Sequence, residues 1–345
     1  MKAKNSQLVT MKDVAKHAGV SQATVSYVLN DVAGENIPEE TQVRVRASIR
    51  ALGYRPNIGA RQMRTQRTNL LGFVTDVIAT TPYAGAIIKG AQDAARSAGK
   101  MLLLMNTDGI PDEESNAIET LLEHRVEGII FATMYHHEVQ PPATLKETQA
   151  VLLDCFVADR SIPSVTPDEV RGGREATEVL LQKGHRRIGF INNSDSIPAT
   201  SGRLLGYQQA LAERGIAFDE SLIRTANASA GGYGYDCALD LMRRPNPPTA
   251  LFCFNDGMAM GAYDALRKLN LAVPDDVAIV GFDNQEIIAA WLHPGLSTMQ
   301  LPHYEMGVWS VKYLLGEISE EDEKQGGDQP IQKVLPCPYV PRASV

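Results

Sequence analysis

Cysteine is scarce in this sequence, and no two of the four cysteines stand in a Cys-x-x-Cys spacing. The residues lack the spacing of zinc or redox motifs, so we expect structural thiols at Cys155, Cys237, Cys253 and Cys337. No run approaches about 18 consecutive apolar residues, and the first residues lack the apolar core of an export signal. We therefore expect a cytoplasmic protein without a membrane partner.

Positive charge is also in deficit, because 33 Lys and Arg stand against 41 Asp and Glu, a formal net charge of −8. That balance alone would argue against nucleic-acid binding. The charges are unevenly distributed, however: residues 1–69 hold eleven Lys and Arg against five Asp and Glu, and the remainder holds 22 against 36. Because a polyanion responds to the charge of the part that it touches, the basic first 69 residues remain compatible with nucleic-acid binding.

Catalytic and metal-binding motifs are lacking too. There is no nucleophile elbow, and no convincing set of acid, base and nucleophile. His136, His137 and Glu138 come nearest to a metal cluster. Adjacent histidines point apart in regular structure and no third ligand is evident, so we expect a solvated loop there, with no metal and no cofactor. These absences favour a binding protein over an enzyme.

What the sequence does contain, near its start, is a pattern of two short helices, MKDVAKHAGVSQATVSYVLN at residues 11–30. Thr10 can cap the first helix together with Asp13, Gly19 supplies the turn that ends it, and Ser21 can cap the second helix. This spacing is typical of a helix-turn-helix unit. Apolar residues at three- and four-residue spacings predict one shared core: Val14, Ala15, Ala18, Val25, Val28 and Leu29.

The side chains left outward on the second helix are small, polar or aromatic: Gln22, Ala23, Ser26 and Tyr27. Such a face suits the major groove of DNA, where Gln22 can pair with adenine and Tyr27 can contact the groove. Hydroxyls at Ser21, Thr24 and Ser26 are available to phosphate oxygens. We expect Gln22, Ala23 and Tyr27 to set the preference for a DNA sequence.

A third helix is predicted from Pro38, whose fixed φ suits a first helical position, to a stop at Gly53. Its apolar residues, which would close a three-helix headpiece, are Val43, Val45, Ile49 and Leu52. The next segment, IGARQMRTQR, carries Arg61, Arg64 and Arg67 on successive turns and has little apolar surface, so alone it would be a marginal helix. It would gain helix if its arginines met phosphates while Met63 was wedged between base pairs of the minor groove.

Beyond Leu70, strand-like and helix-like patterns alternate, which predicts an α/β fold with parallel sheets. LLGFVTD, KMLLLMN, GIIFAT and AVLLDCF are typical of buried strands, with helices such as 84–98 and 113–124 between them. The pattern restarts after Asp168 with RRIGFIN, TALFCFND and VAIVGFDN. Two similar lobes are therefore predicted, and a small molecule would bind at the carboxyl ends of their strands.

Polar residues at those strand ends are candidates for binding the small molecule: Asp76, Thr133, Asn192 with Asn193, Asn255 with Asp256, and Asp283. Asp and Asn offer two close hydrogen-bonding atoms, which suits the vicinal hydroxyls of a sugar. Arg203 would add a rigid donor fork, and Tyr83 and Trp291 could lay a ring against the sugar. Strand-end Asp and Asn can instead cap the following helix, and both aromatic residues can be rim packing, so those alternatives stay open.

Together these residues resemble the LacI/GalR family of bacterial transcription regulators along nearly the whole chain. The head motifs are MKDVAKHAGVSQATVSYVLN, TQVRVRASIRALGYRPN and ARQMRTQRTNLLGFV. The core motifs are DEVRGGREATEVLLQKGHRRIGFI, SGRLLGYQQAL, FNDGMAMGAYDAL, VPDDVAIVGFDN, HPGLSTMQ and YVPRAS. Met63 stands where the family usually has a leucine, and Pro38 occupies its usual hydroxyl N-cap site. Because Met is flexible and similar in volume, we expect the wedge to remain.

The resemblance implies an α/β fold class: an N-terminal three-helix helix-turn-helix headpiece plus hinge helix, then two doubly wound parallel α/β lobes of the periplasmic-binding-protein type. The implied headpiece is 1–56, the hinge 57–69 and the effector-binding and dimerisation core 70–345. The chain would cross between lobes near Thr166, near Ser297 and within 317–329. The implied N-subdomain is 70–166 with 298–329, and the C-subdomain is 167–297 with 330–345.

Residues and resemblance together give two candidate sites. The expected DNA contacts are Thr10, Ser21, Gln22, Ala23, Thr24, Ser26, Tyr27, Asn30, Tyr54, Asn57, Ala60, Arg61, Met63 and Arg64. Arg203, Asn255 and Asp283 match family positions that hold the effector, and Asp76 matches a contact position in the other lobe. The remaining expected effector contacts are Tyr83, Thr133, Asn192 and Trp291.

The resemblance implies a transcriptional regulator, most simply a repressor, that binds a pseudo-palindromic operator as a homodimer. A small-molecule effector would control it, by default a sugar and alternatively a purine or nucleoside. The competing interpretation is a sugar-binding protein of the periplasmic type without a DNA-binding role, or an α/β sugar-processing enzyme. The first would carry an apolar export signal and the second a placed acid, base or metal, and the sequence shows neither.

Overall fold

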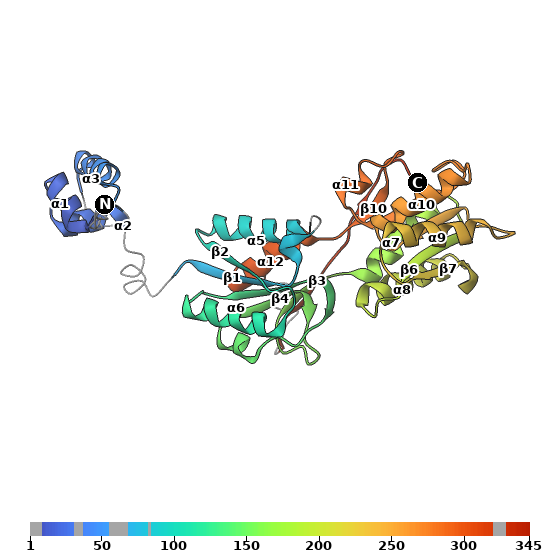
Figure 1. Ribbon diagram of the computed structural model, residues 1–345, viewed down its shortest axis with the longest axis horizontal. Coiled ribbons are helices and arrows are strands. Elements are labelled where there is room, and N and C mark those ends of the chain that lie inside the picture. Colours follow the sequence, from blue (N-terminus) through green and yellow to red (C-terminus); the bar gives the residue numbers. More distant parts are fainter. Residues whose placement is uncertain (1–8, 31–36, 55–67, 82–83, 320–328) are drawn as a thin grey trace, which may run out of the picture. The chain divides into compact units, whose positions relative to one another are not determined.

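The computed structural model describes residues 9–30, 37–54, 68–81, 84–319 and 329–345. The chain divides into two compact units, residues 1–68 and 69–345 (Figure 1). No helix in these described ranges is long and apolar enough to cross a membrane.

The described residues of the first unit form three helices, α1 (Met11–Ala18), α2 (Gln22–Asn30) and α3 (Glu39–Leu52). The predicted capping box is confirmed: the Thr10 hydroxyl accepts from the Asp13 backbone N–H at 3.4 Å, and the Asp13 carboxylate accepts from the Thr10 N–H at 2.9 Å. Gly19 ends α1 with a φ of 66°, a left-handed conformation that glycine adopts without strain. The tight turn places α2 directly after α1.

The headpiece core lies between these three helices. Val14, Val25 and Val45 are fully buried there. The expectation that Val43 also faces the core is wrong, since its side chain is 59% exposed. Residues two positions apart on a helix lie about 200° apart around its axis, so Val43 and Val45 cannot share one face. Pro38 is the N-cap of α3 rather than its first residue, and no side-chain bond caps that end.

The first lobe of the second unit is built on a six-stranded sheet in the order β11-β5-β4-β3-β1-β2, with every neighbouring pair parallel. Helices α5 and α12 pack together over one face, and α6 covers the other (Figure 1). The elements are β1 (Leu70–Thr75), η1 (Ile78–Thr80), α5 (Gly85–Ser97), β2 (Met101–Asn106), α6 (Pro111–Glu123), β3 (Ile129–Glu138), η2 (Ala143–Glu147), β4 (Ala150–Phe156), β5 (Ser164–Pro167), α12 (His303–Leu314) and β11 (Gln332–Leu335).

The second lobe repeats the plan with the order β12-β10-β9-β8-β6-β7, in which only β12 is antiparallel to its neighbour. One buried cluster joins α7 and α8 to the sheet, and another joins α9 and α10. The elements are α7 (Glu169–Gln182), β6 (Ile188–Asn193), α8 (Pro198–Glu213), η3 (Glu220–Leu222), β7 (Ile223–Ala226), α9 (Gly231–Met242), β8 (Ala250–Cys253), α10 (Asp256–Lys268), β9 (Ala278–Asp283), α11 (Glu286–Ala289), β10 (Ser297–Gln300) and β12 (Tyr339–Val340).

Two of the expected subdomain boundaries need correction. Strand β10 pairs with β9, so residues 297–300 still belong to the second lobe and the second crossing follows Gln300 rather than Ser297. Strand β11 pairs with β5, so residues 332–335 belong to the first lobe and the third crossing follows Leu335. Both are four-residue strands, too short for their alternation to identify a partner sheet from sequence.

Strand β2 is half exposed rather than buried as expected. It forms one edge of its sheet, and Met101 and Leu104 are 63% and 37% exposed. A continuous apolar run such as MLLLM is typical of a central strand, and only its place in the sheet identifies it as an edge. This lobe therefore presents apolar side chains on an open sheet edge.

Candidate functional site

The outward side chains of α2 form the first candidate site. Gln22 and Ala23 are exposed, while Ser26 and Tyr27 are half-buried. The Ser21 hydroxyl caps α2, since it accepts a hydrogen bond from the Thr24 backbone N–H at 3.1 Å. The helix therefore begins rigidly at the residues expected to meet base edges.

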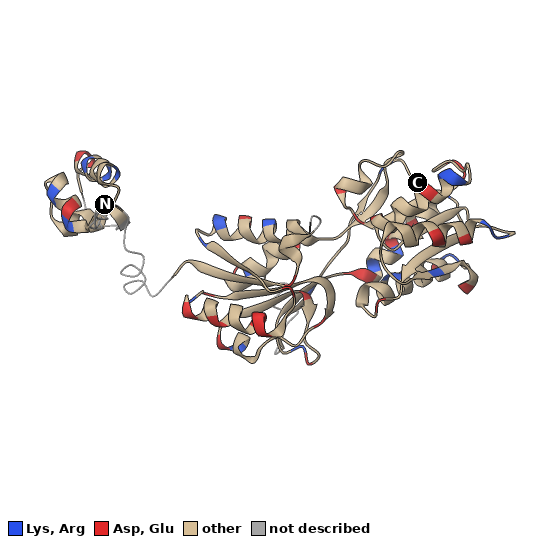
Figure 2. Ribbon diagram, viewed as in Figure 1, with Lys and Arg blue, Asp and Glu red and all other residues tan. Residues whose placement is uncertain are grey.

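Other expected DNA contacts are only partly described. Thr10 is exposed within its capping box, and Tyr54 packs its half-buried ring against the headpiece core. Lys and Arg lie on α1 and α3 of this unit (Figure 2). The side chain of Asn30 and the expected contacts Asn57, Ala60, Arg61, Met63 and Arg64 lie outside the described residues.

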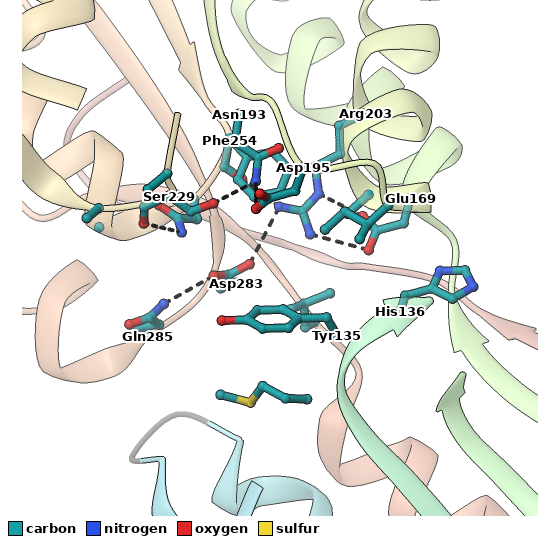
Figure 3. A pocket seen from close by; sticks show the side chains of 18 of the residues that line it. Tyr135, His136, Glu169, Asn193, Asp195, Arg203, Ser229, Phe254, Asp283 and Gln285 are labelled. Carbon is teal, nitrogen blue, oxygen red and sulfur yellow. Dashed lines mark hydrogen bonds and ion pairs between the residues drawn. The ribbon is translucent and has the colours of Figure 1, made fainter. Parts of the chain in front are cut away.

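The second candidate site is a cavity of about 490 Å³ in the second unit, to which both lobes contribute (Figure 3). The first lobe supplies residues of β3 and β4, and the second supplies strand ends and helix starts. The lining residues are Met134, Tyr135, His136, Asp154, Glu169, Asn193, Asp195, Ile197, Ala199, Arg203, Ala228, Ser229, Ala230, Phe254, Asn255, Gly257, Asp283, Gln285 and Leu301.

Arg203 lies at the centre of the polar part of this cavity. Its Nε donates to Glu169 Oε2 at 2.7 Å and its Nη2 to Glu169 Oε1 at 3.3 Å, a two-pronged ion pair between buried side chains. Its Nη1 donates to the Phe254 carbonyl at 2.5 Å and lies 3.7 Å from an Asp283 oxygen. The guanidinium carbon is 3.7 Å from the centre of the Phe282 ring and 4.4 Å from that of Phe254. Charge pairing and ring stacking together fix the guanidinium.

Close packing of α7 on α8 sets this ion pair. A Cβ on Gly173 would lie 2.6 Å from Arg203 Cα, and one on Gly202 would lie 2.8 Å from Glu169 Cβ. A Cβ on Gly206 would overlap the Val170 carbonyl oxygen. Only glycines let the two backbones approach this closely, and the approach holds Glu169 and Arg203 opposite each other.

Asp283 ends β9 beside Arg203 (Figure 3). Its backbone has a φ of 102°, in the region that L-residues rarely adopt, and its Oδ2 accepts from Gln285 Nε2 at 3.1 Å. Burial raises the pKa of this carboxyl to about 6, although the Arg203 charge lowers it in part. The strained turn aims a carboxyl group with a raised pKa into the cavity.

Asp154 on β4 and His136 on β3 are ionisable residues that the first lobe contributes to the lining of the cavity. Asp154 is buried in β4 with a φ of 58°, and its Oδ1 has no hydrogen-bond partner. Burial, then the charge of Glu169, holds its pKa well above the usual range. Burial lowers the pKa of His136 to about 4, so the ring is neutral at pH 7. The expectation of a solvated loop at His136 is wrong, because β3 continues through this residue to Glu138.

Asn255 combines the two roles that the sequence left open. It is the N-cap of α10, where its Oδ1 accepts from the Met258 N–H at 2.8 Å. Its Nδ2 donates to the Ser229 carbonyl at 3.1 Å, and the residue lines the cavity. The cap therefore orients a side chain that a ligand can reach.

Four expected effector contacts do not line the cavity and are corrected here. Asn192 is buried and donates to the Thr200 carbonyl, while its neighbour Asn193 faces the cavity. Adjacent strand residues point to opposite sides, so only one of the pair can line it. Thr133 donates to the carbonyls of Tyr135 and Asp154.

Asp76 accepts from the backbone N–H of Met134 at 3.0 Å, which makes it a support of β3. Trp291 is 77% exposed and follows α11 outside the cavity. Tyr83 lies outside the described residues.

Sequence reasoning missed two buried acidic residues that line the cavity, Glu169 and Asp154. The lone Asp within the apolar run AVLLDCF could have indicated Asp154, because burying a carboxyl group in a strand is unfavourable and therefore uncommon. Nothing in the sequence marks Glu169 as buried. The cysteines are unpaired, as expected, and no group of three His, Cys, Asp or Glu in the described part of the chain could hold a metal ion.

Comparisons with known proteins match both units of the chain. Residues 10–57 match the family model described as bacterial regulatory proteins, lacI family, and residues 68–342 match periplasmic binding proteins and sugar binding domain of LacI family. The HTH-type transcriptional regulator RegA of Clostridium saccharobutylicum is 34% identical, covering 91% of this chain and 93% of the relative. The ribose operon repressor of Escherichia coli K12 is 32% identical, covering 92% and 96%.

Among solved structures, a Lac repressor dimer bound to operator and the anti-inducer ONPF is similar with a TM-score of 0.75 and 26% identity, covering 98% of this chain and 99% of that one. The family models cover the helix-turn-helix and both lobes, and the relatives are transcriptional regulators rather than enzymes. The chain belongs to the LacI family of DNA-binding transcriptional regulators.

Proposed function

We propose that this regulator is a repressor that binds a pseudo-palindromic operator as a homodimer and is switched by a sugar in the cavity between its lobes. The observation that carries the proposal is the convergence of acceptors from both lobes, Asp154 from one and Asn255 and Asp283 from the other. A ligand that bridges them stabilises one relative position of the lobes over another. Acting on chromosomal DNA would place the protein in the cytoplasm.

Operator reading is assigned to α2. Gln22 and Ala23 are exposed on a helix whose start is capped, which suits insertion into the major groove. Ser21, Thr24 and Ser26 would contact phosphates, and Tyr27 the groove wall. Arg61, Arg64 and Met63 remain the expected minor-groove contacts of the segment that follows the headpiece.

A second copy of the chain is needed because one headpiece reads too few base pairs for useful specificity. Large apolar side chains that water reaches favour an interface. Met101 and Leu104 are exposed on the β2 edge, and Ile287 and Trp291 are 65% and 77% exposed around α11. We therefore assign dimer contacts to these two surfaces and move Trp291 from the effector site to the interface.

Selection of bound duplexes from a random DNA library by the full-length protein tests this proposal. We expect a palindrome to be enriched, and the protein to sediment as a dimer both free and bound. A site without two-fold symmetry, or a monomer bound to one half-site, would contradict the homodimer. Headpiece residue Glu40, exposed on the first turn of α3, provides a control variant, Glu40→Gln, that should select the same palindrome.

A further inference from the structure

Every nitrogen of the Arg203 guanidinium already has an oxygen acceptor. Nε and Nη2 donate to the two oxygens of Glu169, and Nη1 donates to the Phe254 carbonyl. The two faces of the group lie near the Phe254 and Phe282 rings. A guanidinium fork in a ligand cavity usually attracts phosphate or carboxylate, but here Glu169 occupies it.

Arg203 is the one basic side chain among the described residues that line the cavity. Once Arg203 is paired with Glu169, the lining still holds the carboxyl groups of Asp154, Asp195 and Asp283, and the described residues contribute no other Lys or Arg to it. His136 supplies no positive charge at pH 7, because burial keeps its ring neutral. An anionic ligand would therefore find no unpaired cation there, and it would be repelled by those carboxyl groups that are ionised.

Two buried polar atoms of lining residues have no hydrogen-bond partner, Asp154 Oδ1 and His136 Nδ1. The Asp154 oxygen belongs to a residue that is only 4% exposed. Leaving such an atom unpaired is unfavourable, so a ligand that donates to it gains more than it would at a solvated oxygen. This second observation is independent of the Arg203 ion pair.

We propose that Glu169 determines the charge class of the effector: by occupying the Arg203 fork it leaves a cavity that accepts hydrogen-bond donors, hydroxyl or ammonium groups, and rejects phosphate and carboxylate. This inference rests on the proposed function, because it concerns the same cavity. The Glu169 carboxylate would repel an anionic ligand, while the hydrogen-bonding groups of the cavity would attract a donor, and both effects contribute to specificity.

The ion pair resists displacement for a physical reason. A phosphate that took the Arg203 fork would leave the Glu169 carboxylate buried without its partner, and breaking one side of a buried pair is strongly unfavourable. The glycine contacts between α7 and α8 also fix the backbones that carry Glu169 and Arg203 opposite each other. Removing the charge of Glu169 is therefore the direct way to change the ligand class.

The test compares Glu169→Gln with a matched control on the same helix, Glu175→Gln. Glu175 pairs with Arg171 at 2.6 Å on the solvent side of α7 and does not line the cavity. Inorganic phosphate is the probe, and calorimetry and melting temperature of the full chain are the readouts. We expect no phosphate binding by wild type or Glu175→Gln, and a gain of at least about tenfold in phosphate affinity for Glu169→Gln.

Phosphate binding by the wild type in this cavity, or no gain in Glu169→Gln beyond Glu175→Gln, would overturn the proposal. If Glu169→Gln fails to fold, the wild type is tested with matched pairs, ribose with ribose 5-phosphate and glucose with glucose 6-phosphate, together with glucosamine. A phosphate ester that binds as tightly as its parent sugar would overturn the proposal. If glucosamine binds more tightly than glucose, the ligand group that donates to the cavity is an ammonium group. If glucose binds more tightly, that group is a hydroxyl.

These outcomes are separate from failure of the proposed function. Charge class is measured by ligand binding alone, whereas the proposed function fails if the protein selects no operator or if a bound ligand leaves operator affinity unchanged. A cavity that rejects phosphate in a protein without operator binding would retain the inference about Glu169 and remove the proposed regulatory role.

Discussion

Asp256 and Gln285 are joined by a short hydrogen bond, in which Asp256 Oδ2 accepts from the Gln285 backbone N–H at 2.6 Å. The other oxygen of Asp256 accepts from the Thr298 hydroxyl at 2.6 Å. Gln285 in turn donates from its side chain to Asp283, which lines the cavity beside it. A fully buried carboxyl group outside the cavity thus holds the turn that carries two of the residues lining it.

Replacing Asp256 with alanine should therefore loosen that turn. Asp256→Ala leaves the Gln285 N–H and the Thr298 hydroxyl without an acceptor, and we expect a loss of roughly 1–3 kcal/mol in unfolding free energy together with weaker effector binding. Urea unfolding and calorimetry measure the two effects. Asp264→Ala, at an exposed site on the same helix, is the control. Equal stability of the two variants would show that Asp256 does not support the turn.

Gly206 gives a packing test. Gly206→Ala would force α7 and α8 apart, because its Cβ would overlap the Val170 carbonyl. We expect a loss of about 1–3 kcal/mol in the free energy of unfolding. We also expect weaker effector binding, because Arg203 lies on α8 and would be displaced with it. Gly232→Ala on α9 is the matched change, since no atom lies within 4 Å of its added methyl group. That variant should keep or slightly raise the melting temperature, and a similar loss in both variants would contradict the packing argument.

Asp283 predicts a pH dependence of stability. Burial raises its folded-state pKa from 3.8 to about 6, with Arg203 opposing the rise and Glu169 adding to it. The folded protein then holds this proton more tightly than the unfolded chain does. The stabilising contribution is present below pH 3.8 and is lost as pH rises through about 6.

Unfolding free energies measured between about pH 4.5 and 7.5 test this sign. The difference between wild type and Asp283→Asn should fall as pH rises toward 6 and stay level above it. Parallel curves for the two proteins would mean that Asp283 does not titrate in this range.

Gln22 should control one position of the operator. We expect Gln22→Ala to lower discrimination at a single base pair by about 1–3 kcal/mol and to leave other positions unchanged, because a groove-facing amide reads one base edge. Affinities for single-base variants of the selected operator give this directly. A uniform loss across all sequences would make Gln22 a backbone contact instead.

The proposed dimer surfaces can be disrupted one at a time. Leu104→Asp and Trp291→Asp each place a charge on an exposed apolar side chain that the proposal assigns to the interface. Sedimentation velocity should show a shift toward monomer and a parallel loss of operator affinity. Leu205→Asp, at a side chain 45% exposed on α8, should leave the dimer intact. Dimers of unchanged stability in the first two variants would place the interface elsewhere.

Much of this fold could be predicted from local chemistry. Thr10, Asp13 and Gly19 determine the ends of α1 by bonds and turn geometry within a few residues, so their pattern is visible in the sequence. The edge position of β2 could not be predicted, because it depends on which strands pair, and pairing is a long-range property.

The cavity was partly predictable for a similar reason. Asn255 and Asp283 end strands of a parallel sheet, and that topology brings such ends together. The choice of Asn193 over Asn192 depends on the register of β6, which sequence alternation leaves ambiguous in a strand buried on both faces. Glu169 could not be predicted, because its place in the cavity depends on the close packing of α7 on α8 at their glycines.

The central claim is that a ligand in the cavity controls operator binding. The most direct test measures the affinity of the full-length dimer for the selected palindrome at rising ligand concentration. Two mixtures of ligands are added in turn, a pool of sugars and a pool of nucleosides. We expect one pool to change operator affinity, and the operator to change affinity for that ligand by the same factor. A ligand that fills the cavity and leaves operator affinity constant would contradict the claim.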